Sequence, residues 1–204
     1  MSKKNKVKYN LSNVHYAVAT IDSYGNATYE KPVPIPGAVS MSFDPKGEPS
    51  NFYADGYAYY TISNNMGYEG DIEVALVPES FKVDVLKQTL DDNKVLVENS
   101  GVETANFALL FEFDGDANKI RHVLYYCSAA RPNIESQTNE EEIEVKSEKL
   151  TIKAAPLGNG LVKAETGSDT TDAIYQNWYK EVYQPVLTGN SNYTYPDPEE
   201  EEEP

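Results

Sequence analysis

The chain has 204 residues and a mass of 22.7 kDa, enough for one domain with its own hydrophobic core. Its net charge of −16 argues against a nucleic-acid-binding protein, because phosphate binding requires clustered lysine and arginine side chains. The single cysteine excludes an intramolecular disulfide and a thiolate zinc site, and with no long apolar run we expect neither a secretory signal nor a membrane span.

The first half of the chain predicts strands separated by turns. Residues 1–13 are expected to form a lysine-containing N-terminal arm, followed by a strand at 14–20. Prolines at every second position of KPVPIPGAV place this segment at a sheet edge or in a connection before a strand at 39–43, because proline cannot donate to a strand ladder. In DIEVALVP, acidic and apolar residues alternate, which predicts a strand with one solvent-exposed face.

The stretch FYADGYAYYTISNNMGYEG, residues 52–70, concentrates aromatic residues where glycine and asparagine indicate a loop. Two interpretations are open. The stretch is either a hairpin whose tyrosines cover its own core or an exposed surface that another molecule buries. The candidate contact residues of the second interpretation are Phe52, Tyr53, Tyr57, Tyr59, Tyr60 and Tyr68.

The second half predicts two helices among strands. The apolar spacing of ESFKVDVLKQTL predicts a helix over about 79–90, and a second, short helix is predicted over about 171–183, capped by Thr171 or Ser168. The apolar run 107–113 predicts a strand buried on both faces, joined to the next strand by a hairpin turn at 114–116. A change of apolar phase in EEIEVKSEKLTIKAAP predicts a β-bulge near 147–149.

These elements predict a mainly β domain at residues 14–187, followed by a disordered acidic tail at 188–204. The sixteen tyrosines favour the same class, since aromatic residues are enriched in strands.

No motif predicts a catalytic, cofactor-binding or metal site. FDGDANK resembles the start of a calcium loop, but Lys119 replaces the required glycine and Tyr125 the bidentate glutamate. His122 and Cys127 lie five residues apart on one predicted strand, which places them on opposite faces, and His15 lies near no nucleophile motif. We therefore expect a protein that is not an enzyme and binds neither a cofactor nor a metal.

Several blocks of the chain closely resemble, in the same order, the major tail proteins of long-tailed bacteriophages, particularly those that infect Gram-positive bacteria. The blocks are KVKYNLSNVHYAV, PVPIPGAVSMSFDPKGE, NFYADGYAYY, GYEGDIEVALVPESF, FALLFEFDGD, RHVLYYCSAARP, EKLTIKA and TTDAIYQNWYKEVY, within residues 6–187. The resemblance implies the tail-tube fold, an antiparallel β-sandwich or barrel-like core flanked by a helix.

The resemblance also implies a function in the virion. Six copies would form a ring, and rings would stack into a non-contractile tail tube, assembled in the host cytoplasm. The implied partners are other copies of the chain, the tape-measure protein, and the distal tail and tail-terminator proteins. Genomic DNA would pass through the tube without specific binding, and no membrane insertion is implied.

Two further expectations concern surfaces. An acidic lumen lets DNA slide, so Asp71, Glu73 and Glu112, which lie on predicted strands, are the candidate lumen-facing residues. The alternative function is a soluble β-sandwich that uses the aromatic stretch to bind carbohydrate or a protein partner. Formation of rings or tubes distinguishes the two functions.

Overall fold

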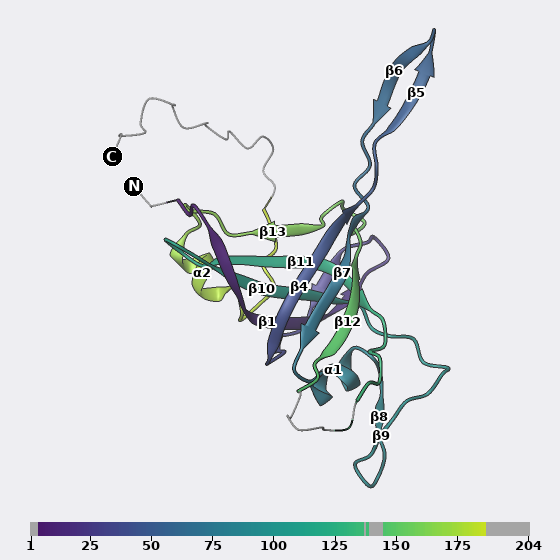
Figure 1. Ribbon diagram of the computed structural model, residues 1–204, viewed down its shortest axis with the longest axis vertical. Helices are drawn as coiled ribbons and strands as arrows, with labels where there is room; N and C mark the ends of the chain where they lie inside the picture. The colour runs from purple at the N-terminus through teal and green to yellow at the C-terminus, as the bar shows by residue number, and fades with distance from the viewer. Residues whose placement is uncertain (1–3, 137, 139–144, 187–204) are drawn as a thin grey trace.

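The computed structural model describes residues 4–136, 138 and 145–186 of the chain (Figure 1). The strands are β1 (Lys8–Ile21), β2 (Ala27–Tyr29), β3 (Val33–Pro34), β4 (Ala38–Lys46), β5 (Ser50–Ala54), β6 (Tyr57–Ile62), β7 (Gly67–Val74), β8 (Thr89–Leu90), β9 (Leu96–Val97), β10 (Phe107–Gly115), β11 (Ile120–Ala129), β12 (Glu148–Ala154) and β13 (Lys163–Glu165). The helices are α1 (Glu79–Asp84) and α2 (Asp172–Asn177). The fold is mainly β and sandwich-like with two short helices, which confirms the predicted fold class.

One large antiparallel sheet forms the body of the molecule. Its strand order is β2-β1-β10-β11-β12-β7-β4, with β13 paired to β11 and β3 paired to β1. Two smaller two-stranded sheets, β5-β6 and β8-β9, project from opposite ends of this body (Figure 1). Between the prolines at 32 and 36, only Val33 and Pro34 lie in a strand, the edge strand β3, as expected where alternate residues lack an N–H donor.

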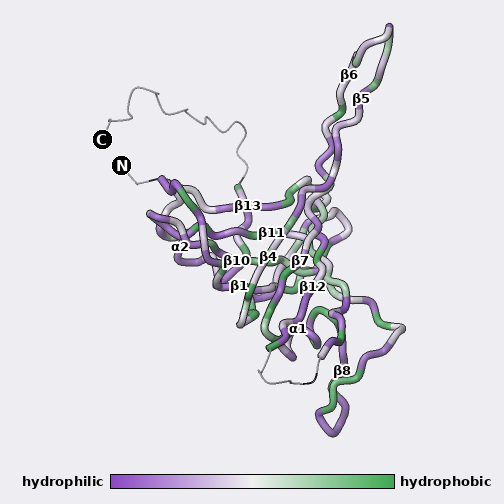
Figure 2. The backbone as a smooth tube through the Cα atoms, viewed as in Figure 1, coloured by the Kyte–Doolittle hydropathy of each residue, from purple (hydrophilic) through white to green (hydrophobic). Residues whose placement is uncertain are grey.

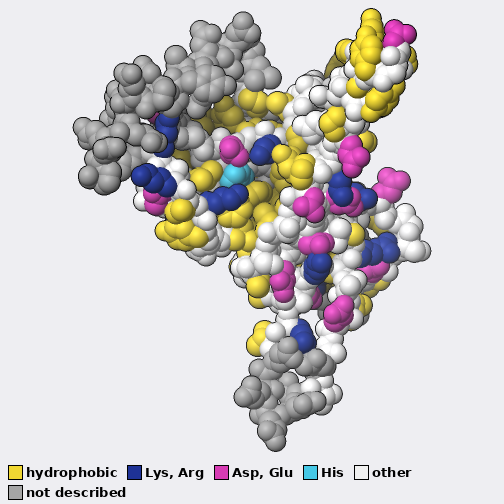
Figure 3. All heavy atoms as spheres, turned by 45° about the horizontal axis from the view of Figure 1, so that its top comes forward, with side chains coloured by type: hydrophobic (Ala, Val, Ile, Leu, Met, Phe, Trp, Pro, Cys, Tyr) yellow, Lys and Arg dark blue, Asp and Glu magenta, His cyan; other side chains and the backbone are white. Residues whose placement is uncertain are grey.

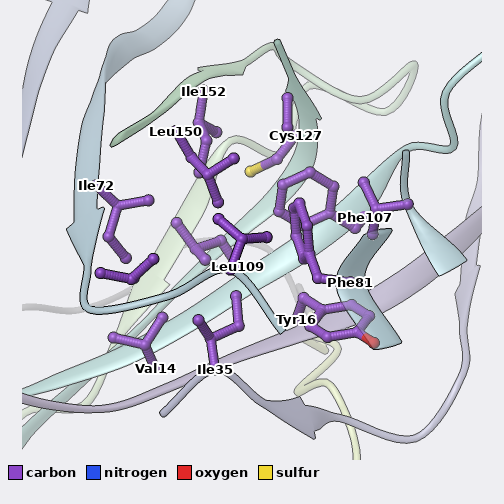
Figure 4. Close-up of a cluster of buried hydrophobic side chains, with 14 of the residues drawn as sticks. Val14, Tyr16, Ile35, Ile72, Phe81, Phe107, Leu109, Cys127, Leu150 and Ile152 are labelled. Carbon is purple, nitrogen blue, oxygen red and sulfur yellow. The ribbon is translucent and has the colours of Figure 1, made fainter. Parts of the chain in front are cut away.

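The main hydrophobic core lies between the two halves of the large sheet. Side chains from β1, β10 and β11 meet side chains from β7 and β12 in one cluster, and Phe81 of α1 closes it (Figure 4). Phe81 packs edge-to-face against both Tyr16 and Phe107, with ring centroids 5.1 and 5.4 Å apart. Burial of these apolar side chains holds the half of the sheet formed by β1, β10 and β11 against the half formed by β12, β7 and β4.

Strand β10 is buried on both faces, as its apolar run predicts. Phe107, Leu109 and Phe111 point into the main core. Ala108 and Leu110 face a second cluster, which the segment after α2 covers with its Trp178 and Val182 side chains. The predicted hairpin is also confirmed, because β10 pairs antiparallel with β11, but β10 continues to Gly115 and the turn lies at 116–119 instead of 114–116.

The first strand is longer than predicted. It begins at Lys8 instead of Val14, so residues 8–13 of the predicted arm pair with β10. Shifts of pairing register on either side of Ser12 allow this extension, and Asn10 and Asn13 adopt positive φ angles of 52° and 51°. The Asn5 side chain then binds backbone groups of the β10-β11 turn, so residues 5–13 are attached to the body.

Both helices have their predicted starts and are shorter than predicted. Helix α1 ends at Asp84 because Lys87 takes a positive φ of 58°, a conformation that ends helices, and Leu90 belongs to β8. Helix α2 follows Thr171, which occupies the cap position without a side-chain cap hydrogen bond. It ends at Asn177 instead of about residue 183.

The predicted β-bulge near 147–149 is wrong. Strand β12 begins only at Glu148, and its pairing with β7 is regular from Glu148 to Ala154. The change of apolar phase therefore marks the start of the strand, with Val145 exposed before it. The predicted acidic tail at 188–204 lies outside the described residues.

Candidate self-association surface

The aromatic stretch forms a projecting β-hairpin instead of a loop. Strands β5 and β6 pair antiparallel and are separated by two residues, Asp55 and Gly56. Both residues have positive φ angles, 53° and 80°, the geometry of a type I′ turn. Asp-Gly is a favoured sequence for this turn because glycine takes a positive φ without steric cost. The local sequence therefore explains why the chain reverses here.

One face of the hairpin is mostly aromatic. Phe52 pairs with Tyr60, and Ala54 pairs with Tyr57, so these residues share a face. Tyr59 lies beside Tyr57, with ring centroids 6.0 Å apart. The irregular pairing between Phe52 and Tyr53 brings Tyr59 and Tyr60 toward the same face. Hydrophobic side chains accordingly cover much of the visible hairpin (Figure 3).

These rings cover no core of their own chain. Phe52, Tyr53, Tyr57, Tyr59 and Tyr60 are each between 55% and 66% exposed, and every residue of β6 is exposed. The interpretation of a hairpin folded over its own core is therefore wrong, because the hairpin extends away from the body (Figure 1). An isolated two-stranded hairpin with exposed aromatic rings is marginally stable in water, so a partner surface would stabilise it.

The hairpin also presents apolar residues that sequence reasoning missed. Ile62 and Met66 are 53% and 60% exposed and lie between the aromatic rings and the body. The sequence could have indicated both residues, because each lies two positions from a tyrosine of the aromatic stretch.

Tyr68 does not belong to this surface. It lies on β7, is half-buried, and packs against the main core between Pro45 of β4 and Ala154 of β12. Gly67, the first residue of β7, precedes it and marks the point where the chain re-enters the large sheet. The prediction that Tyr68 is an exposed residue of the aromatic stretch is therefore wrong, because Tyr68 belongs to the body of the molecule.

Asp71 and Glu73 lie together on the polar outer face of β7, as their alternation with apolar residues predicts. Lys149 Nζ on β12 lies 2.7 Å from Asp71 Oδ2 and Ser40 Oγ on β4 donates to Glu73 at 2.9 Å. Hydrogen bonds from Lys149 and from Ser147, respectively, hold the pKa values of Asp71 and Glu73 below their usual range. Both carboxylates remain ionised at neutral pH, so neither is poised to act as an acid.

Glu112, the third predicted lumen residue, is buried and cannot line a solvent-filled channel. Lys119 Nζ lies 2.7 Å from Glu112 Oε1, Arg121 Nε lies 3.2 Å from Oε2, and Asn13 Nδ2 donates to Oε1 at 2.6 Å. The Tyr179 hydroxyl also donates to this carboxylate. The expectation was wrong because β10 alternation places Glu112 on the face of Leu110, which the segment after α2 covers.

The remaining candidate groups are structural. Cys127 is fully buried, and burial raises the pKa of its thiol, which disfavours the reactive thiolate. The His122 ring stacks on Phe111 at 5.0 Å, and burial lowers its pKa to about 4. Among the described residues, no group of three or more histidine, cysteine, aspartate or glutamate side chains could hold a metal ion.

Comparisons with protein families and with curated proteins identified no relative of this chain. No protein-family model matches the chain, and no curated protein matches it significantly. Within the described part of the chain, none of the helices has the length and apolar character needed to span a membrane.

Proposed function

We propose that this chain is a structural subunit of the tail tube of a long-tailed bacteriophage, which assembles into hexameric rings that stack around the path of genomic DNA. The observation that carries the proposal is the β5-β6 hairpin, whose five exposed aromatic rings have no cover in their own chain. The sequence resemblance to major tail proteins supports it, as does the mainly β, sandwich-like fold.

The shape of the molecule suits head-to-tail assembly. Rings and tubes require heterologous contacts, in which one surface of a subunit meets a different surface of the next. The β5-β6 hairpin projects from one end of the body, and β8-β9 projects from the other (Figure 1). The β8-β9 end has a hydrophilic tip and beside it exposes three hydrophobic residues, Leu90, Val95 and Val97 (Figure 2).

The exposed rings of the hairpin supply energy for assembly. Each ring is 55–66% exposed, so a contact buries roughly 90–120 Å² of it and contributes roughly 2–3 kcal/mol at ~25 cal/mol per Å² before the cost of ordering. Several such rings together offset much of the loss of translational and rotational freedom on association.

The direct test is electron microscopy of the concentrated full-length protein. We expect rings or tubes of uniform bore in negative stain. Protein that stays monomeric and binds sugars would instead support the carbohydrate-binding alternative. The structure favours self-association over that alternative, because the aromatic rings lie on a projecting hairpin, whereas small-ligand sites are concave.

Within this proposal, the polar face of β7 is the candidate wall of the lumen. The carboxylates of this face are balanced by Lys46, Lys149 and Lys153 of the neighbouring strands. We expect Asp71→Lys and Glu73→Lys together to slow DNA ejection from tails of normal length, because the two changes make the face basic and a basic wall binds phosphates. The measurement is the ejection rate of phage that carry the substitutions. Glu103→Lys together with Asp169→Lys, at exposed positions outside this face, is the charge-matched control. Unchanged ejection in the double variant would remove Asp71 and Glu73 from the lumen.

A further inference from the structure

A cavity of about 350 Å³ lies between the two halves of the large sheet. Its lining comes from the first residue of β1 and from β4, β7, β10, β11 and the start of β13. The rings that line it are Phe43, Tyr68, Phe111, Phe113 and His122, and two lysines, Lys8 and Lys163, belong to the same lining. The sequence marks none of these seven residues as a group, because they come from six separate strands.

The two lysines give the aromatic cavity a positive charge. Lys8 Nζ lies 5.2 Å from the centroid of the Phe113 ring, and Lys163 Nζ lies 5.6 Å from that of Tyr68. Glu165 partly neutralises Lys163, with 3.5 Å between Nζ and Oε2. Lys8 makes no ion pair with a described carboxylate. His122 is uncharged at neutral pH, so the lining has a net charge near +1 when Glu165 is included.

The tip of the β5-β6 hairpin has the complementary chemistry. Its turn exposes Asp55, and the exposed residues Tyr53 and Tyr57 stand two positions before and two positions after it in the sequence. The tip is narrow, because the two-residue turn joins strands only ~5 Å apart. An acid flanked by aromatic rings is the type of group that a pocket of aromatic rings and lysines accepts.

We infer that the cavity is the receptor for the hairpin tip of a second copy of this chain. A tyrosine ring at the tip packs against Phe111 and Phe113, and the Asp55 carboxylate faces Lys8 and Lys163. The hairpin does not reach the cavity of its own chain, because it extends away from the body (Figure 1). The contact is heterologous and therefore propagates into a ring or a filament. This inference rests on the proposed function and specifies the partner surface of the hairpin.

A charge exchange in the full-length protein tests the inference. Asp55→Lys alone, or Lys8→Asp with Lys163→Asp, is expected to weaken self-association at least about tenfold, because like charges then face each other. The same three substitutions in one chain are expected to restore association to within about threefold of the original, since the pair is re-formed with reversed polarity. The measurement is the concentration dependence of mass in sedimentation equilibrium.

Mixing provides a sharper form of the same test. Each variant chain is expected to associate poorly alone. In an equimolar mixture, the basic tip of the Asp55→Lys chain meets the acidic cavity of the Lys8→Asp, Lys163→Asp chain. The Asp55 tip of the second chain meets the basic cavity of the first, so the mixture is expected to assemble. The matched controls are Asp169→Lys for the first chain and Lys31→Asp with Lys180→Asp for the second. These positions are exposed and lie outside the cavity and the hairpin, so the changes should leave association unchanged.

The outcomes separate the inference from the proposed function. The inference is overturned if Asp55→Lys or the double lysine change does not weaken assembly. It is also overturned if neither the triple variant nor the mixture restores assembly. In both cases the tube proposal still stands. A chain that stays monomeric in every form, at concentrations where tube subunits assemble, contradicts both.

Discussion

Replacing Tyr57, Tyr59 and Tyr60 with serine is expected to abolish assembly while leaving the folded monomer intact. The three rings are more than half exposed and lie on a hairpin that covers no core, so their loss should change the free energy of unfolding by no more than about 0.5 kcal/mol. At an interface, each buried aromatic anchor contributes about 2 kcal/mol or more. We therefore expect the concentration required for assembly to rise at least about 100-fold.

Two measurements check this expectation. Urea unfolding of the monomer, followed by circular dichroism, should give the same midpoint for the original and the triple variant. Negative-stain microscopy and sedimentation should detect assemblies only for the original. Tyr24→Ser is the matched control, because Tyr24 is 87% exposed on a turn outside the hairpin. Normal assembly of the triple variant would show that the hairpin is not the contact.

Replacing Glu112 with alanine is expected to destabilise the monomer by about 3–5 kcal/mol, because the change leaves Arg121 and Lys119 without their buried partner. The carboxylate joins β10 to β11 through Arg121 and to the turn before β11 through Lys119. It also binds Asn13 of β1 and Tyr179 of the segment after α2. Arg121 also lies over the Tyr175 ring, 3.8 Å from its centroid, so the same loss should loosen α2.

The control for Glu112 is an exposed ion pair. Glu98 Oε1 lies 3.2 Å from Arg131 Nη1 with both side chains about half exposed, and Glu98→Ala should cost at most about 1 kcal/mol. Equal losses of stability in the two variants, measured by urea unfolding at pH 7, would contradict the structural role of Glu112.

The stabilising effect of Glu112 should also depend on pH. Burial alone raises its pKa, but hydrogen bonds from Lys119 and Asn13 and the charges of Lys119 and Arg121 outweigh burial, so its pKa lies below the ordinary value of 4.5. A carboxylate with a lowered folded-state pKa contributes its full stability above the unfolded pKa and loses it as the pH falls through the folded pKa. The stability difference from Glu112→Gln should therefore shrink below about pH 4.5, whereas a constant difference would contradict the ionised state.

Local patterns predicted much of the fold. The alternation in β7 correctly separates Asp71 and Glu73 from the buried Ile72 and Val74, because a strand places successive side chains on opposite faces. The apolar run of β10 likewise predicts burial on both sides. Of the six aromatic residues predicted as contacts, five are exposed on one hairpin, and their contact with another molecule stays a prediction.

Other predictions failed where the deciding contact lies far away in the sequence. Glu112 has the local pattern of a strand carboxylate, and its burial depends on Tyr179, 67 residues later. Tyr68 belongs to the tyrosine-rich stretch by composition, yet pairing with β4 and β12 places it against the core. The cavity with Lys8 and Lys163 has no sequence signal, because six separate strands form it.

The sequence by itself determined the strand class, the turns and the aromatic character of residues 52–60, because backbone geometry, glycine and proline act over a few residues. Tertiary structure decided which of these residues remain exposed, since burial depends on which distant segments pack against them. The Asp-Gly turn could fold a hairpin onto its own sheet or away from it. Here β4 and β7 extend it beyond the body, which leaves its aromatic rings available to another molecule.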